Sequence, residues 1–79
     1  MIIKIKTFGI ARDILGGREV ELVLNGNSVA DLRAQLNSSY PELKRLSSLF
    51  IAINLEYAAD DHLLTEKDEI ALIPPVSGG

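Results

Sequence analysis

Two segments near the start of the chain alternate apolar and polar residues, and their closeness restricts the fold more than any other feature. Residues 2–8 place Ile3, Ile5 and Thr7 on one face, and residues 19–24 repeat the alternation. The link between them is too short for the crossover that parallel strands need. The two segments are therefore predicted to form an antiparallel hairpin whose apolar face must be covered by another element.

The opposite face of this hairpin carries charges. By the same alternation, Lys4, Lys6 and Phe8 share the outward face of the first strand. Glu19 and Glu21 lie on the outward face of the second strand, so the two lysines are expected opposite the two glutamates. Phe8 is then an apolar side chain among charged ones, on the side that faces solvent.

A single amphipathic helix follows and can cover the apolar face. Ser28 is a good N-cap and Asp31 completes a capping box, with aspartate in the place of glutamate. Its apolar stripe consists of Val29, Leu32, Leu36 and Tyr40. Pro41 is predicted to end the helix. Further strands are predicted at residues 50–54 and 68–73, which gives an α+β fold of one sheet packed on one helix.

Composition limits the kinds of chemistry that the chain can perform. A chain of 79 residues forms one domain, residues 1–79, and it contains no cysteine that could form a disulfide, bind a metal or act as a nucleophile. The net charge of −3 comes without a basic cluster, which argues against nucleic acid as a partner. No apolar run approaches the roughly 20 residues of a membrane span, and no signal peptide is recognisable. We therefore expect a cytoplasmic protein.

The chain closes on the sequence IPPVSGG. Pro74 and Pro75 each fix φ near about −65° and offer no N–H, so they are expected to end the last strand and to hold the start of the tail extended. Gly78 and Gly79 lack a Cβ and can pass through a narrow channel. Residues 74–79 are thus predicted to be a protruding tail, although a frayed terminus is the ordinary alternative.

Four stretches of sequence identify a family that the chain resembles. They are FGIARDILG after the first strand, SVADLRAQL at the start of the helix, INLEY before the late loop and, above all, LTEKDEIALIPPVSGG. The chain resembles the small subunits of molybdopterin synthase, which are ubiquitin-like sulfur carriers with a β-grasp fold. The resemblance implies a mixed sheet of four to five strands packed on one main helix. It also implies that the last strand is central and parallel to the first.

The resemblance further implies that the working group is the α-carboxylate of Gly79. A ubiquitin-activating-type adenylyltransferase would adenylate it with ATP, and a sulfur-donating enzyme would convert the adenylate into a thiocarboxylate. The tail would then enter the large subunit of molybdopterin synthase and donate sulfur to cyclic pyranopterin monophosphate, forming the dithiolene of molybdopterin. The tail residues that accompany Gly79 are Pro74, Pro75, Val76, Ser77 and Gly78. No cofactor is expected to bind the chain itself, and the isolated chain is not expected to be a catalyst.

Four residues are implied as partner contacts. Phe8, Tyr57 and Ile73 correspond to apolar positions at which the family contacts the large subunit, so they are expected to form a docking patch. Single exposed apolar residues are also ordinary on protein surfaces. Arg12 corresponds to a family position where it could steer an acidic partner or hold the tail, and a solvated surface charge is an equal alternative.

Two residues depart from the family pattern. Leu55 stands where the family often has glycine, and leucine tolerates positive φ poorly, so another type of turn is expected there. Lys67 also replaces a common glycine and is expected to bear some strain if the backbone of the family is kept there. His62 lies beside Asp60 and Asp61, but one histidine on a loop is expected to be solvated and to bind no metal.

Two other functions stay open from the sequence. The chain could be a related carrier that serves thiamine, cysteine or tRNA thiolation, or a modifier that is conjugated to lysines. It could also be a β-grasp interaction module whose terminal glycines have no chemical role.

Overall fold

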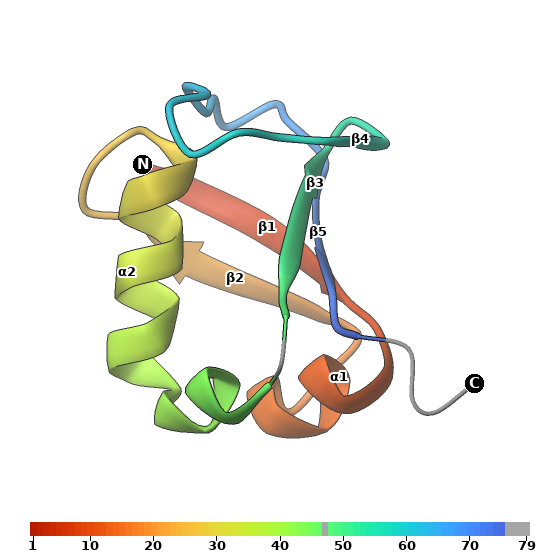
Figure 1. The fold of residues 1–79 in the computed structure, drawn as a ribbon. Helices are drawn as coiled ribbons and strands as arrows, with labels where there is room; N and C mark the ends of the chain where they lie inside the picture. Colours follow the sequence, from red (N-terminus) through yellow and green to blue (C-terminus); the bar gives the residue numbers. More distant parts are fainter. Residues whose placement is uncertain (47, 76–79) are drawn as a thin grey trace.

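The computed structural model describes residues 1–46 and 48–75, and it has the predicted α+β architecture (Figure 1). The elements are β1 (Ile2–Thr7), α1 (Gly9–Leu15), β2 (Glu19–Val23), α2 (Val29–Ser39), the 3-10 helix η1 (Pro41–Arg45), β3 (Phe50–Ile53), β4 (Glu56–Tyr57) and β5 (Ile70–Ile73). Among the residues described, no helix has both the length and the hydropathy needed to cross a bilayer.

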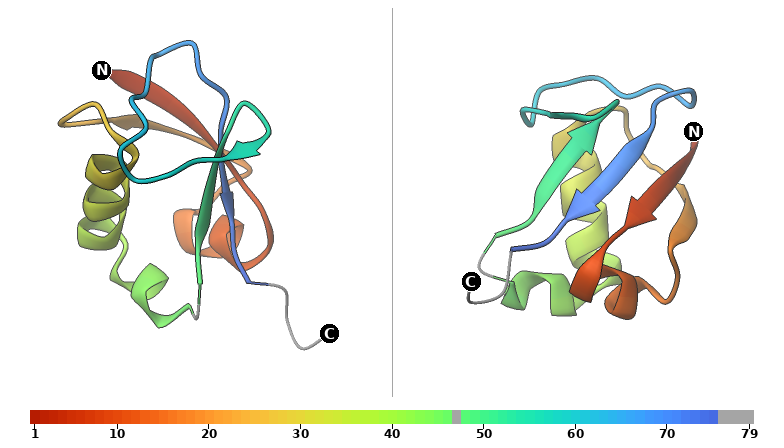
Figure 2. Two further views of the ribbon diagram at one scale, coloured as in Figure 1. Left: turned by 45° about the horizontal axis from the view of Figure 1, so that its top comes forward. Right: turned by 90° about the vertical axis from the view of Figure 1, so that its right-hand side faces the viewer.

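The five strands form one mixed sheet in the order β2-β1-β5-β3-β4. The hairpin of β1 and β2 is antiparallel, as predicted, and β5 lies in the centre, parallel to β1 and antiparallel to β3. This confirms the β-grasp arrangement that the resemblance implied. The view onto the sheet in Figure 2 (right) has β5 between β1 and β3, with α2 behind them. Within the described part of the chain, the face turned away from α2 carries no helix.

The core lies between α2 and the inner face of the sheet. The largest fully buried side chains come from β1, α2, β3 and β5, and they are Ile3, Ile5, Val29, Leu32, Leu36, Ile51, Ile70 and Leu72. The apolar stripe predicted for the helix is therefore confirmed at its first three positions, and Tyr40 packs at the edge of the core. The inward residues of the first strand are buried as expected, including Thr7, whose hydroxyl donates a hydrogen bond to the carbonyl of Gly17.

The capping box predicted at the start of α2 is present. The Ser28 hydroxyl accepts a hydrogen bond from the backbone N–H of Asp31, and the Asp31 carboxylate accepts from the N–H groups of Asn27 and Ser28. These bonds stabilise the charged carboxylate, so they hold the pKa of Asp31 below its ordinary value. The helix ends at Ser39, and Pro41 opens η1, as expected of a residue that cannot continue the helix.

The turn between β3 and β4 differs from the expectation. Asn54 has φ 52° and Leu55 has φ 71°, so leucine does adopt the left-handed conformation that it was expected to avoid. Positive φ at both positions is typical of a type I′ two-residue hairpin loop, whose twist matches that of the flanking strands. Lys67 does not adopt the backbone on which strain was expected, since Asn54 and Leu55 are the non-glycine residues with positive φ in residues 1–46 and 48–75.

The strand boundaries also differ slightly from the predicted ones. The third strand, β3, stops at Ile53 because the turn begins at Asn54, and the short strand β4 follows the turn. The last strand begins at Ile70, later than predicted, because Asp68 belongs to the preceding turn, where its carboxylate accepts from the N–H of Thr65. Along β5, Ile70 and Leu72 are buried, whereas Ala71 and Ile73 on the other face are partly buried.

Candidate docking face and tail exit

The base of the tail is fixed where β5 leaves the sheet. β5 ends at Ile73, which confirms that Pro74 and Pro75 follow the last residue of the ladder. Both prolines are partly buried. Gly9 has φ 55°, and a Cβ built on it would lie 3.3 Å from Cγ of Pro74, so the proline ring packs closely over the first residue of α1. The tail residues Val76, Ser77, Gly78 and Gly79 lie outside the described residues.

Three of the four predicted contact residues lie close together on the outer face of the sheet. Phe8 follows β1, whose last residue pairs with Leu72, so Phe8 stands next to Ile73. Phe8 is 52% exposed and Tyr57 is 68% exposed, whereas Ile73 is partly buried. The prediction that Phe8 points away from the core is therefore confirmed, and an apolar surface adjoins the place where the tail begins.

The sequence analysis missed a fourth member of this surface. Phe50 pairs with Ile73 in the β3–β5 ladder and stacks on Tyr57, with ring centroids 5.1 Å apart. Strand parity could have found it, because Phe50 alternates with the buried Ile51. We call Phe8, Phe50, Tyr57 and Ile73 the apolar patch.

A shallow groove of about 350 Å³ runs across the sheet beside the apolar patch. Its floor consists of Ala71 on β5 and Ala52 on β3, which are register partners. On either side of the floor, Lys6 pairs with Ala71 and Tyr57 pairs with Ala52, so one row crosses four strands. Ala52 is only 5% exposed, although it faces away from the core cluster. We call this hollow the alanine groove.

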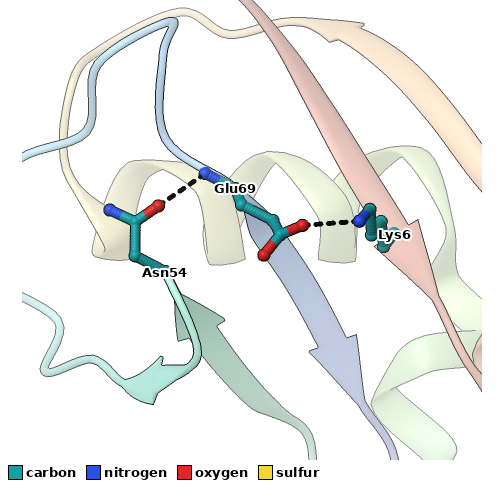
Figure 3. A network of polar contacts seen from close by, with 3 residues as sticks. All are labelled: Lys6, Asn54 and Glu69. Carbon is teal, nitrogen blue, oxygen red and sulfur yellow. Dashed lines mark hydrogen bonds and ion pairs between the residues drawn. The ribbon is translucent and has the colours of Figure 1, made fainter.

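Leu55 and an ion pair complete the rim of the alanine groove. Leu55 is 88% exposed. The ammonium of Lys6 donates to Oε1 of Glu69 at 2.5 Å, and the Glu69 N–H donates to Oδ1 of Asn54 at 2.9 Å (Figure 3). The hydrogen bond to Glu69 raises the pKa of Lys6, and the charges of Glu69 and Glu19 act in the same direction.

The pairing of Lys6 only partly follows the prediction. Lys6 and Glu19 are register partners in the hairpin, as expected. The ammonium nevertheless forms its ion pair with Glu69, just before β5. The sequence pattern of the hairpin could not indicate this, because the neighbour on the other side of β1 comes from the end of the chain.

Arg12 does not line the alanine groove. It lies exposed on α1 and lines a separate hollow of about 460 Å³, together with Phe8, Gly9 and Arg18. That hollow adjoins the apolar patch through Phe8, so Arg12 is near the tail exit and off the sheet face. Its role stays a prediction.

The site has the properties of a binding surface. Across residues 1–46 and 48–75, no group of three or more histidine, cysteine, aspartate or glutamate side chains could hold a metal ion. His62 is exposed on its loop, as expected. The described residues of the face offer apolar contacts, one ion pair and the base of a tail that leads to two glycines.

Comparison with known proteins identifies the family. The profile described as the ThiS family matches residues 5–79, nearly the whole chain. The chain belongs to the ThiS family. The match includes β5, the prolines and both terminal glycines.

Relatives of this ThiS-family chain share its full length. It is 33% identical to the molybdopterin synthase sulfur carrier subunit of Arabidopsis thaliana, over 98% of this chain and 82% of that protein. It is 36% identical to the protein of the same name from Chlamydomonas reinhardtii, over the whole of both chains.

Solved structures share the fold. A putative molybdopterin converting factor subunit 1 from Pyrococcus furiosus has a TM-score of 0.84 at 27% identity, covering 96% of this chain and 99% of that one. SAMP1 from Haloferax volcanii has a TM-score of 0.80 at 29% identity over both whole chains. A chain from the complex of subunits 1 and 2 of the molybdopterin-converting factor of Helicobacter pylori has a TM-score of 0.68 at 28% identity, also over both whole chains.

Proposed function

We propose that this ThiS-family chain is the sulfur-carrier small subunit of a molybdopterin synthase. The observation that carries the proposal is its similarity to molybdopterin synthase sulfur carrier subunits along the entire chain. The family match extends to Gly79, the residue on which the proposed chemistry depends.

The proposed chemistry takes place on the α-carboxylate of Gly79. A carboxylate is a poor electrophile, and adenylation by an activating enzyme with ATP gives it a good leaving group. A sulfur-donating enzyme then supplies sulfur and AMP leaves, which produces the thiocarboxylate. In the large subunit, the thiocarboxylate donates its sulfur to cyclic pyranopterin monophosphate. We place these reactions in the cytoplasm, where ATP is available.

The fold supports this proposal through the position of β5. As the central strand, β5 is held by ladders on both sides, and Pro74 packs on Gly9, so the base of the tail has a defined exit. The apolar patch lies beside this exit and would dock on the large subunit while the tail enters its active site. The likeness to a subunit solved in complex with its partner in Helicobacter pylori is consistent with such docking.

Intact-mass spectrometry tests the proposal directly. The chain is incubated with an activating enzyme, ATP and a sulfur source, and its mass is expected to change by the replacement of one oxygen by sulfur. Addition of the large subunit and cyclic pyranopterin monophosphate should then return the chain to its original mass and yield molybdopterin. A chain that acquires sulfur but yields no molybdopterin would contradict the assignment to this synthase and keep only the role of sulfur carrier.

One observation favours a second candidate function. Two solved structures of small archaeal modifier protein 1, from Haloferax volcanii and Methanosarcina acetivorans, have TM-scores of 0.80 and 0.78 to this chain at 29% and 31% identity. In this alternative, the adenylated Gly79 forms an amide with lysine side chains of other proteins. Digestion of cell extracts followed by mass spectrometry separates the two functions, because only a modifier leaves its C-terminal residues attached to lysine.

A further inference from the structure

The floor of the alanine groove is unusual for the centre of a sheet. Alanine is depleted in β-strands relative to β-branched and aromatic residues. Here Ala71 and Ala52 face one another on the two neighbouring strands β5 and β3, on the side away from α2. Larger residues stand on either side of them, Lys6 on β1 and Tyr57 on β4. The pair of alanines therefore makes a hollow where the flanking residues project.

Leu55, at the rim of this hollow, combines a left-handed backbone that the hairpin loop imposes with a side chain that is almost fully exposed. Its φ of 71° is unfavourable for any residue with a Cβ, and glycine would adopt it without strain. Its side chain is 88% exposed, so few contacts inside the domain offset that strain. Strained residues of this kind are concentrated at ligand clamps and binding sites.

The turn that carries Leu55 is also held firmly in place. The side chain of Asn54 accepts a hydrogen bond from the N–H of Glu69 and donates one to Oδ1 of Asp68, at 2.9 and 3.0 Å. These bonds tie the turn to the residues that precede β5. Leu55 is therefore presented at a fixed position over the groove, which reduces the ordering cost of a contact made there.

We propose that the alanine groove receives a large apolar side chain of the large synthase subunit, and that Leu55 and the apolar patch form the walls around it. This inference rests on the proposed function. It adds the alanine floor and Leu55 to the docking surface, and it assigns to Leu55 the role of a specificity-determining residue.

The position of the groove points to a protein that takes up the tail, which in the proposed function is the large subunit, and the measurements below distinguish it from the activating enzyme. Ile73 lines the groove and directly precedes the tail. The tail, residues 74–79, spans at most about 20 Å when fully extended. A protein that takes Gly79 into its active site must therefore cover the end of the sheet where the groove begins.

The charges at the groove favour an apolar occupant. Lys6 and Glu69 already form an ion pair at its end. A charged side chain entering beside them would lose its hydration without gaining a free counter-charge. An apolar side chain meets alanine, leucine and aromatic surfaces and fits the pattern of an anchor that fills a partner's pocket.

Filling the groove is the first test. Ala71→Leu places a larger side chain on the floor, and its outward direction keeps it away from the core. Ala34→Leu on the exposed side of α2 is the matched control. Overfilling a packed site costs about 1–3 kcal/mol, so Ala71→Leu should raise the Kd for the large subunit by about 5- to 150-fold. The control should leave the Kd unchanged, and both variants should keep the melting temperature of the unmodified chain.

The second test removes the Leu55 side chain, which we expect to affect stability and binding in opposite directions. Leu55→Gly relieves the left-handed strain, so the melting temperature should stay the same or rise. The same change removes the apolar wall, so the Kd for the large subunit should rise by roughly tenfold. A side chain with a merely structural role would not produce unchanged or higher stability together with weaker binding.

Three measurements on each variant decide the matter: titration with the large subunit, thermal unfolding and the rate of thiocarboxylate formation by the activating enzyme. Unchanged Kd values for both variants would overturn the groove proposal and leave the proposed function standing. Slower thiocarboxylate formation with unchanged Kd would overturn it as well, by assigning the groove to the activating enzyme. If the unmodified chain forms a thiocarboxylate but does not bind the large subunit, the proposed function fails, and the groove proposal fails with it.

Discussion

The apolar patch makes a prediction whose size can be worked out from the exposure of one residue. Fully burying a phenylalanine side chain stabilises a protein by about 1.5–3 kcal/mol. Phe8 is 52% exposed, so about half of this, roughly 0.8–1.5 kcal/mol, is left for a docking partner to gain. Phe8→Ala should therefore weaken binding to the large subunit by about 4- to 13-fold.

The other half of Phe8 already packs against the domain. The same substitution should therefore lower the free energy of unfolding by about 1 kcal/mol, and the melting temperature by roughly 4–8 °C for a domain of this size. Calorimetric titration and thermal unfolding on the same variant measure the two losses separately. The structure predicts that they are similar in size.

Ile2 provides the matched control for this experiment. It lies on β1, on the same face as Phe8, and is 54% exposed, but it stands at the opposite end of the strand from the tail exit. Ile2→Ala should lower stability by a similar or smaller amount and leave the Kd unchanged. If Ile2→Ala weakened binding as much as Phe8→Ala, or if Phe8→Ala lost stability without losing affinity, the location of the docking surface would be wrong.

Three further predictions concern the tail and the dependence on pH. Deletion of Gly79 should abolish thiocarboxylate formation and leave thermal unfolding unchanged, and sulfur gain by the shortened chain would refute the proposed chemistry. Replacement of both Pro74 and Pro75 by glycine should slow synthase turnover more than adenylation, because ordering the more flexible tail costs more conformational entropy. If the variant and the unmodified chain had equal rates in both assays, the prolines would have no mechanical role. Hydrogen bonds lower the folded-state pKa values of Asp31 and Asp68. The two carboxylates therefore stabilise the folded state fully at pH values above their unfolded-state pKa of about 3.9, and this stabilisation is lost as the pH falls below that value. Urea unfolding at pH 3 and pH 6 measures this, and changing both residues to asparagine should reduce the difference between the two.

Local patterns in the sequence predicted the parts of the fold that depend on neighbouring residues. The hairpin of β1 and β2 follows from alternation along two nearby segments, and α2 follows from its capping box and apolar stripe. The parallel pairing of β1 with β5 joins opposite ends of the chain. No local pattern indicates such a pairing, and it was expected only because the chain resembles a known family.

The candidate site also contains residues that a local sequence pattern predicts and residues that it does not. Parity along β1 correctly placed Phe8 on the outer face, and the same reasoning applied to β3 would have found Phe50. The alanine groove could not be predicted from the sequence, because its floor depends on the register between β5 and β3. The conformation of Leu55 was predicted wrongly because the intrinsic cost of positive φ was weighed without the twist of the flanking strands, which a type I′ hairpin loop matches.

The arrangement of β5 fixes the base of the tail relative to the apolar patch. A partner that binds both the apolar patch and the tail requires a fixed distance and direction between them, and sites built on strands hold such geometry better than sites on loops. Ile73 belongs to the patch and is also the last residue of β5, directly before Pro74. Since β5 is hydrogen-bonded to β1 and β3 on its two sides, the tail exit cannot shift relative to Phe8 or Phe50 without breaking the sheet. The element that stabilises the fold therefore also fixes Pro74, the first residue of the tail, relative to the apolar patch.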